Sequence, residues 1–120
     1  MAKTSELDRL RAICMAIPGA FEKLSHGEPT WFTGPKGKTF VMFDNHHHGA
    51  PHISAYVAGT IDQQEMLVAA DPARYWVPPY VGHKGWIAIV LDTGPDWDAV
   101  AQLVKESFAL VSAKKVRARR

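Results

Sequence analysis

An uninterrupted apolar run, Trp-Ile-Ala-Ile-Val-Leu at residues 86–91, is the feature that most constrains the fold of this 120-residue chain. The run is too short for a helix of ordinary length and is rich in β-branched residues, so it predicts a strand buried on at least one face. Gly82 and Gly85 precede it and allow a tight turn. The two adjacent prolines before that turn predict an exposed or sheet-edge polyproline segment over residues 77–80. A sheet must therefore form around residues 86–91.

Periodic apolar residues elsewhere predict three helices and four further strands. Ser5 and Thr60 are expected helix caps, because a hydroxyl at this position accepts a hydrogen bond from the N–H three residues on. These two helices are expected to run to residue 17 and to residue 70. The remaining expected elements are strands at residues 21–25, 30–33, 38–44 and 53–58, a short turn through residue 75, and a helix from about residue 95 to residue 112 or beyond.

Hairpin-connected strands with helices before, between and after them predict an α+β fold. We expect one domain over residues 1–120, a two-layer sandwich with a mainly antiparallel sheet of about five strands covered by helices. The single cysteine, Cys14, lies on the apolar stripe of the first helix, which predicts a reduced core thiol and a cytoplasmic protein. No window is apolar enough over a sufficient length to cross a bilayer, so no membrane association is expected. Function is expected on any sheet face that the helices leave open.

The net charge of +2 is unevenly distributed along the chain. Five of the 14 Lys and Arg residues form a basic tail at residues 114–120, which leaves nine basic against 12 acidic residues, a net charge of −3, in residues 1–113. Because non-specific affinity for nucleic acid grows with the number of phosphates neutralised, binding would depend on this tail and on local clusters of cations.

Five short motifs, spread from residue 26 to residue 97, together resemble the MmcQ/YjbR-like family. The resemblance covers about residues 5 to 115. It implies a small α+β fold, similar in topology to type III secretion chaperones, and a "double wing" description under which members are labelled DNA-binding proteins. The motifs are His26-Gly-Glu-Pro-Thr-Trp31, Gly37-Lys-Thr-Phe-Val-Met-Phe43, Asp71-Pro-Ala-Arg-Tyr75, Pro78-Pro-Tyr-Val-Gly-His-Lys-Gly-Trp86 and Asp96-Trp97.

The leading prediction is therefore a non-enzymatic cytoplasmic protein that binds DNA weakly, without a cofactor, as a monomer or weak homodimer. Cations in the residue 34–38 turn, in the residue 82–85 turn and in the tail would contact phosphates, and an aromatic ring would stack on bases. The expected binding residues are Lys36, Lys38, Tyr80, His83, Lys84, Lys114, Lys115 and Arg117.

Some relatives have also been called phosphoribosylglycinamide formyltransferases. Asn45-His46-His47 does place a histidine two residues after an asparagine, as that chemistry requires, but any histidine run after an asparagine does so. The glycine-rich phosphate loop of a doubly wound domain does not occur in the sequence. The sequence therefore does not favour the formyltransferase interpretation.

Two alternatives to DNA binding stay open. The first is a small-ligand or protein-binding pocket lined by His26, Glu28, Trp31 and Trp86, with Tyr80 beside them. The second is a metal site, since imidazoles bind Zn, Ni or Cu at neutral pH. Its candidate ligands are His46, His48 and His52. The glycine and proline that follow the histidine run also fit an exposed polar turn.

Overall fold

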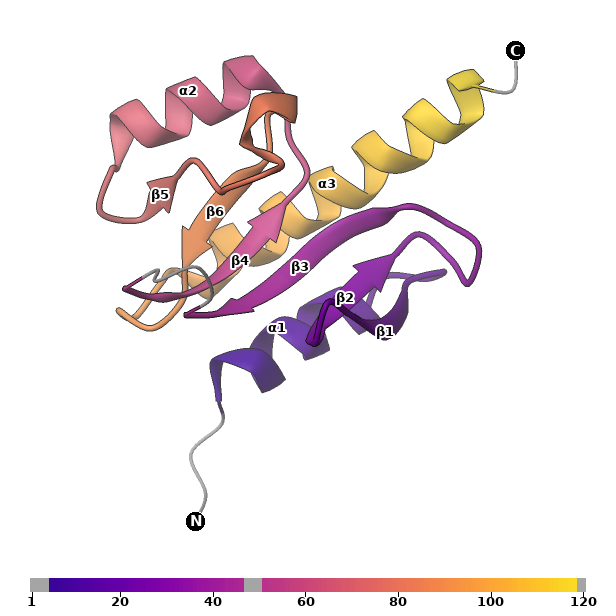
Figure 1. Cartoon of the computed structure of the whole chain (residues 1–120), viewed down its shortest axis with the longest axis horizontal. Coiled ribbons are helices and arrows are strands. Elements are labelled where there is room, and N and C mark those ends of the chain that lie inside the picture. Colours follow the sequence, from indigo (N-terminus) through magenta and orange to yellow (C-terminus); the bar gives the residue numbers. More distant parts are fainter. Residues whose placement is uncertain (1–4, 47–50, 119–120) are drawn as a thin grey trace.

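A six-stranded sheet and three α-helices make up the part of the chain that the computed structural model describes, residues 5–46 and 51–118, with side chains as far as residue 113 (Figure 1). The strands lie in the order β1-β2-β3-β4-β6-β5, and every neighbouring pair is antiparallel. The predicted α+β class is confirmed. The elements are α1 (Glu6–Met15), β1 (Phe21–Ser25), β2 (Glu28–Phe32), β3 (Thr39–Asn45), β4 (Ile53–Val57), α2 (Ile61–Ala70), β5 (Tyr75–Trp76), the 3₁₀ helix η2 (Gly82–Lys84), β6 (Ile87–Val90) and α3 (Trp97–Ala118).

Side-chain caps fix where the helices begin. Ser5 Oγ accepts a hydrogen bond of 3.0 Å from the Asp8 N–H, and Thr60 Oγ1 accepts one of 3.2 Å from the Gln63 N–H, so both predicted caps are confirmed. Asp96 Oδ1 accepts from the N–H groups of two residues in the first turn of α3 in the same way. Helix α1 ends at Met15, two residues before the predicted end. The proline at position 18 disfavours helical geometry in the residue before it, which accounts for the early stop.

The strand prediction missed one element and misjudged the start of another. The predicted turn through residue 75 contains a sixth strand, β5, which has only two residues and pairs with β6. β2 begins at Glu28 rather than at residue 30, because His26 and Gly27 alone form the turn, with φ of 55° and 83°. Pro29 is tolerated inside β2 because the pairing with β3 begins only at Thr30, so the missing N–H removes no hydrogen bond from that ladder.

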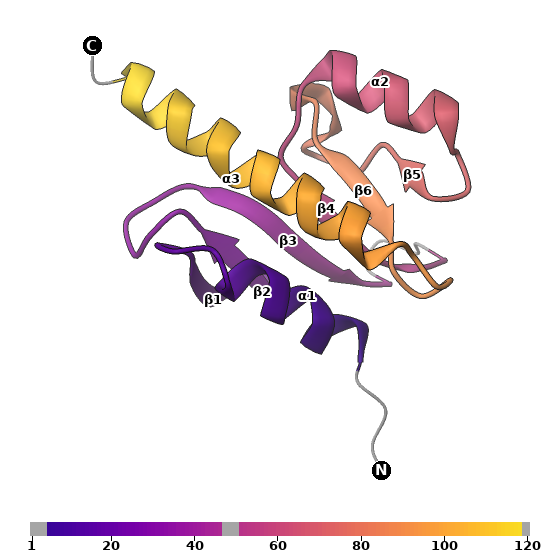
Figure 2. The ribbon, with the colours of Figure 1, turned by 180° about the vertical axis from the view of Figure 1, so that it is seen from behind.

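Helices α1 and α3 cover one face of the sheet (Figure 2). Alternation along the strands points one set of side chains at these helices, and the set is apolar. The core residues from the strands are Trp31, Val41, Phe43, Ala55, Val57, Ile87 and Ile89, and those from the two helices include Leu10, Cys14, Val100 and Val104. Within the described residues, no helix is long and apolar enough to span a membrane.

Two contacts, made by neighbouring residues of α3, hold this helix against the sheet. Ser107 Oγ donates to the carbonyl oxygen of Ala58, just beyond the end of β4, at 2.6 Å. The Phe108 ring meets the Phe40 ring edge to face, with 5.0 Å between their centroids. The C-terminal turns of α3 therefore extend past the end of the sheet where β4 ends and β3 begins (Figure 1).

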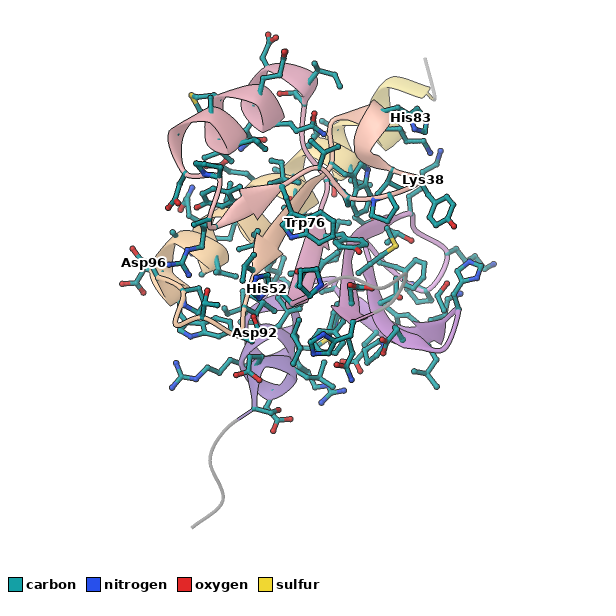
Figure 3. All side chains as sticks on the ribbon, turned by 60° about the vertical axis from the view of Figure 1, so that its left-hand side comes forward. Lys38, His52, Trp76, His83, Asp92 and Asp96 are labelled. Atoms are coloured by element: carbon teal, nitrogen blue, oxygen red, sulfur yellow. The ribbon has the colours of Figure 1, made fainter. Side chains whose placement is uncertain are left out.

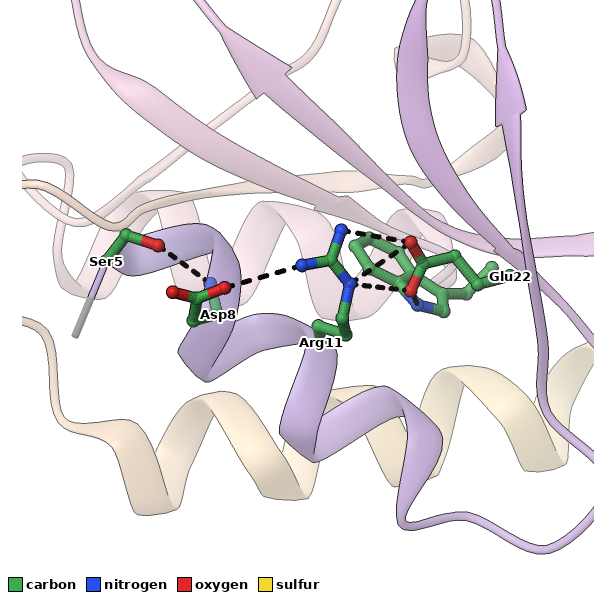
Figure 4. A network of polar contacts seen from close by, with 5 residues as sticks. Ser5, Asp8, Arg11 and Glu22 are labelled. Carbon is green, nitrogen blue, oxygen red and sulfur yellow. Dashed lines mark hydrogen bonds and ion pairs between the residues drawn. The ribbon is translucent and has the colours of Figure 1, made fainter.

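An ion pair holds α1 against β1. Arg11 Nε lies 2.9 Å from Glu22 Oε1, and Arg11 Nη2 lies 3.1 Å from Glu22 Oε2 (Figure 4). The same carboxylate accepts a hydrogen bond of 3.0 Å from Trp31 Nε1. One carboxylate thus satisfies the indole N–H of a fully buried tryptophan and a guanidinium on the covering helix.

Helix α2 lies at the β5–β6 end of the sheet and holds the loop that precedes β6 (Figure 1). The buried amide of Gln64 donates to the carbonyls of Gly82 and Trp86, at 2.8 and 2.7 Å. Gly85 has φ of 98°, and a Cβ there would lie 2.5 Å from the backbone of Thr60. This position therefore needs a glycine both for its backbone angle and for its close approach to α2.

Candidate functional site

The face of the sheet turned away from α1 and α3 (Figure 1) is here called the open face, and it mixes polar and apolar side chains. Strand pairing places Met42, Tyr56, Ala88 and Trp76 in one row across β3, β4, β6 and β5. In the adjacent row, Asp44 of β3 pairs with Ser54 of β4. The open face therefore carries the Asp44 carboxylate and the Ser54 and Tyr56 hydroxyls within the sheet itself.

Two cavities lie on the open face and share Tyr56 and Pro79. The Trp76 cavity, of about 780 Å³, is lined by residues that include His52, Tyr56, Trp76, Val77, Pro79 and Val90. The Asp44 cavity, of about 520 Å³, is lined by residues that include His26, Glu28, Thr30, Met42, Asp44, Tyr56, Pro79 and Tyr80. Both volumes fall in the range of sites that hold small molecules.

Four polar residues are buried in the floor of this face, Asp44, Ser54, Tyr56 and Thr30, with only 4%, 0%, 6% and 2% of their surfaces exposed. The Tyr56 hydroxyl and the Ser54 hydroxyl make no hydrogen bond to any described residue. Burial raises the pKa of Tyr56, and the nearby charge of Asp44 raises it further. Burial and the neighbouring Asp44 carboxylate therefore both favour the protonated phenol.

The Tyr56 ring is held in place by a second aromatic ring. Tyr56 and Trp76 meet edge to face, with 5.7 Å between centroids and 90° between ring planes. Such pairs fix the orientation of both rings. Tyr56 therefore forms the wall between the two cavities and lines each of them.

The rim of the Asp44 cavity contains strained backbone at Tyr80. The Val81 N–H donates to the Pro79 carbonyl at 2.7 Å, and the intervening Tyr80 has φ of 66°. A three-residue turn with a positive φ at its centre is rare and costs energy. Tyr80 is 76% exposed, so the turn presents this ring to solvent beside the cavity. Strain of this kind is concentrated at functional sites.

Of the four predicted pocket residues, two line the Asp44 cavity and two do not. His26 and Glu28 line it, and Glu28 Oε2 also accepts a hydrogen bond from the Asn45 N–H at 3.1 Å. Trp31 is fully buried on the opposite face under α1, so its predicted place in the pocket is wrong. Trp86 is half-buried and packs against the core on the helix side. The sequence alone did not show which face of the sheet the helices cover, so it did not determine whether Trp31 points into the core or toward the cavity.

The predicted metal ligands do not come together within the described residues. His52 Nδ1 lies 3.0 Å from Asp92 Oδ1, and Asp92 Oδ2 accepts from the Ile53 N–H (Figure 3). His46 is exposed, with φ of 60°, whereas His48 lies outside the described residues. The described part of the chain holds no group of three or more His, Cys, Asp or Glu side chains able to hold a metal ion.

The predicted DNA-binding residues in the two turns are exposed. Lys36 and Lys38 lie in the connection from β2 to β3, and His83 and Lys84 lie in η2. None of these four forms an ion pair with a described residue. The side chains of Lys114, Lys115 and Arg117 lie outside the described residues, although the backbone of α3 continues to Ala118.

Sequence reasoning did not find the group formed by Asp44, Ser54 and Tyr56. The detectable signal was an acid at the end of an otherwise apolar strand and a serine and tyrosine two positions apart in the next strand. These residues share a face only if β3 and β4 pair in the observed register.

Comparison with known proteins agrees with the fold. The model of the YjbR family matches residues 15–110. The crystal structure of Deinococcus radiodurans protein DR2400, which contains the family domain DUF419, superposes with a TM-score of 0.77 at 18% identity, over 94% of this chain and 85% of that one. No curated protein matches the sequence. The family match spans most of the chain, and the chain therefore belongs to the YjbR family.

Proposed function

We propose that this YjbR-family protein is a non-enzymatic cytoplasmic protein that binds DNA through cations gathered at one end of the strands of its sheet. This end, where β3 and β6 begin and β4 ends, is here called the Lys38 edge. The proposal includes a monomer or weak homodimer without a cofactor. The observation that carries it is the common position of the two lysine-bearing turns and the end of α3.

Strand pairing supports the common position of the two turns. Val41 of β3 pairs with Val57 of β4, and Val57 pairs with Ile87 of β6. Lys38 precedes Val41 by three residues, and Lys84 precedes Ile87 by three residues. Because β3 and β6 flank β4 and run in the same direction, both lysines leave the sheet at the same edge. Figure 3 shows Lys38 and His83 at one end of the molecule and His52 and Asp92 toward the other.

The contacts of α3 bring the basic end of the chain toward the same edge. Ser107 is anchored to Ala58, at the end of β4, and the helix continues for 11 residues from there to Ala118. The C-terminal turns of α3 therefore extend beyond the Lys38 edge. The sequence of those turns contains Lys114, Lys115 and Arg117.

Acidic residues limit the strength of this site. Asp62 lies in the first turn of α2, next to the end of β4, and Glu106 lies beside Ser107. With a net charge of −3 over residues 1–113, the body of the protein repels phosphates. We expect a Kd in the range of about 10⁻⁴ to 10⁻⁶ M at physiological salt, the range of non-specific binding.

Fluorescence anisotropy with a labelled 20-base-pair duplex, measured from about 50 to 200 mM salt, tests the proposal. Lys38→Glu and Lys84→Glu should each weaken binding to all duplex sequences alike and reduce the magnitude of the salt slope by about 1. Arg9→Glu is the matched control, since Arg9 is exposed but lies over the Trp97 ring at the start of α3, far from the Lys38 edge.

Absence of binding by the unaltered protein at 50 mM salt would overturn the proposal. So would equal losses in Lys38→Glu, Lys84→Glu and Arg9→Glu, because binding would then depend on total charge rather than on this edge.

A further inference from the structure

We propose that the Asp44 cavity binds a small organic cation, a primary ammonium attached to an apolar group. This site is separate from the Lys38 edge and independent of DNA binding.

Buried hydroxyls without partners point to a ligand. Tyr56 lines the cavity, is 6% exposed, and its hydroxyl makes no hydrogen bond to a described residue. Buried polar groups in folded proteins almost always have a partner. The Ser54 hydroxyl, which is fully buried beside Asp44 in the sheet, also makes no hydrogen bond to a described residue. A bound molecule that donates hydrogen bonds here would give the Tyr56 oxygen its missing partner.

The charges around the cavity indicate whether the ligand is a cation or an anion. Asp44 and Glu28 line the Asp44 cavity, and the described residues that line it include neither lysine nor arginine. The two carboxylates would therefore repel an anionic ligand, whereas they would attract a cationic one.

The acceptors select a primary ammonium among organic cations. An –NH₃⁺ group carries three N–H donors, and carboxylate and phenol oxygens can both accept from it. A quaternary ammonium carries no N–H donor and would therefore leave the Tyr56 oxygen without a hydrogen bond. The geometry thus favours a ligand with N–H groups over one that offers charge alone.

Apolar lining residues would hold the rest of the molecule. Met42 forms part of the floor, Pro79 and the exposed Tyr80 ring lie at the side, and Tyr56 separates this space from the Trp76 cavity. A volume of about 520 Å³ accommodates a ring and a short chain. An aromatic or branched aliphatic amine therefore fits the site better than a free polyamine, which has no apolar group to bury.

Isothermal titration calorimetry with 2-phenylethylamine tests the assignment in the intact chain. Two probes of related shape serve as comparisons, the anion 3-phenylpropionate and the quaternary trimethyl derivative of the amine. The amine should bind at least about tenfold more tightly than either, since hydrogen bonds to a charged group distinguish ligands by at least this factor.

Two variants locate the binding. Asp44→Asn should weaken amine binding about tenfold or more, and Tyr56→Phe several-fold. Asp98→Asn, the same chemical change at an exposed site on α3, should leave it unchanged. Thermal melting shows whether each variant is folded. If Asp44→Asn does not fold, Tyr56→Phe still tests the assignment.

Equal binding of the amine and the carboxylate would overturn the proposal, and so would no binding of any probe up to 10 mM, a concentration set by the weakest fragment affinities of about 1 mM. Amine binding that survives Tyr56→Phe unchanged in a folded variant would likewise exclude this cavity. DNA binding by the same protein is measured separately, so failure of one proposal leaves the other standing.

Discussion

Single residues on the open face are arranged in a way that does not favour stability. Ser54 and Tyr56 lie in the middle of a sheet whose other face is a close-packed apolar core, yet their hydroxyls lack partners within the described residues. An unpaired buried hydroxyl costs about 1–3 kcal/mol relative to a paired one. Groups that cost stability and are kept in the floor of a cavity are candidates for binding.

Removal of these hydroxyls should therefore not destabilise the protein. We expect Ser54→Ala and Tyr56→Phe to leave the free energy of unfolding unchanged or to raise it by up to about 1 kcal/mol, because each removes an unpaired polar atom with little change in volume. Urea unfolding measures the effect. A loss above about 1 kcal/mol in both variants would mean that the hydroxyls have structural partners.

Cys14 predicts how stability changes at alkaline pH. Burial raises the pKa of its thiol above the ordinary value of 9.0, with a smaller contribution from the charge of Glu22. The unfolded chain releases the thiol proton above about pH 9 while the folded protein keeps it. The contribution to stability is therefore complete below pH 9, and the free energy of unfolding falls above it by up to about 1.4 kcal/mol per pH unit.

Urea unfolding at pH 8, 9 and 10 in the unaltered protein and in Cys14→Ala checks this expectation. The variant is less stable at every pH because of the cavity, but its decline between pH 9 and pH 10 should be shallower. Tyr56 adds a similar decline above about pH 10 in both proteins, since its pKa is raised as well. Parallel curves would contradict the assignment to Cys14.

At the scale of elements, the contact between α1 and β1 depends on Glu22. Glu22→Gln keeps an acceptor for Trp31 Nε1 but loses the charge that pairs with Arg11, so we expect a loss of about 1 kcal/mol. Glu22→Ala also leaves a buried indole N–H unpaired, and we expect a total loss of about 2–3 kcal/mol. Denaturant unfolding compares the two.

Asp8→Asn is the control for that series. Asp8 reaches Arg11 at 3.4 Å, but its side chain is 61% exposed, so the change should cost less than about 0.5 kcal/mol. A Glu22→Gln loss as large as that of Glu22→Ala would show that the ion pair, rather than the indole hydrogen bond, dominates.

Local signals in the sequence were sufficient to predict most elements, whereas pairing between distant strands was not predictable. The caps at Ser5 and Thr60 and the strand at residues 21–25 depend on neighbours within four positions, and they are confirmed. β5 has two residues, too few for any alternation, so its position follows only from its pairing with β6. The meeting of Asp44 with Ser54 depends on the register of β3 and β4, which local sequence does not determine.

For the whole molecule, the distribution of charge makes the tail decisive for binding polyanions. Truncation after residue 113 changes the net charge from +2 to −3. We expect duplex DNA binding at 50 mM salt to be lost or reduced by more than tenfold, because five cations are removed. Anisotropy measurements on the truncated chain test this, with unchanged thermal melting as the control for folding. Undiminished binding would contradict a role for the tail.

The shortness of β5 has a consequence for self-association. After two residues the ladder passes to Val77 and then to Pro78 and Pro79, which have no amide hydrogens to offer another chain. An exposed backbone edge is what templates the stacking of neighbouring chains into fibrils. At the β5 edge of the sheet, the strand ends after two residues and two prolines follow. Another chain therefore cannot extend the sheet there by continuous backbone pairing, even at high protein concentration.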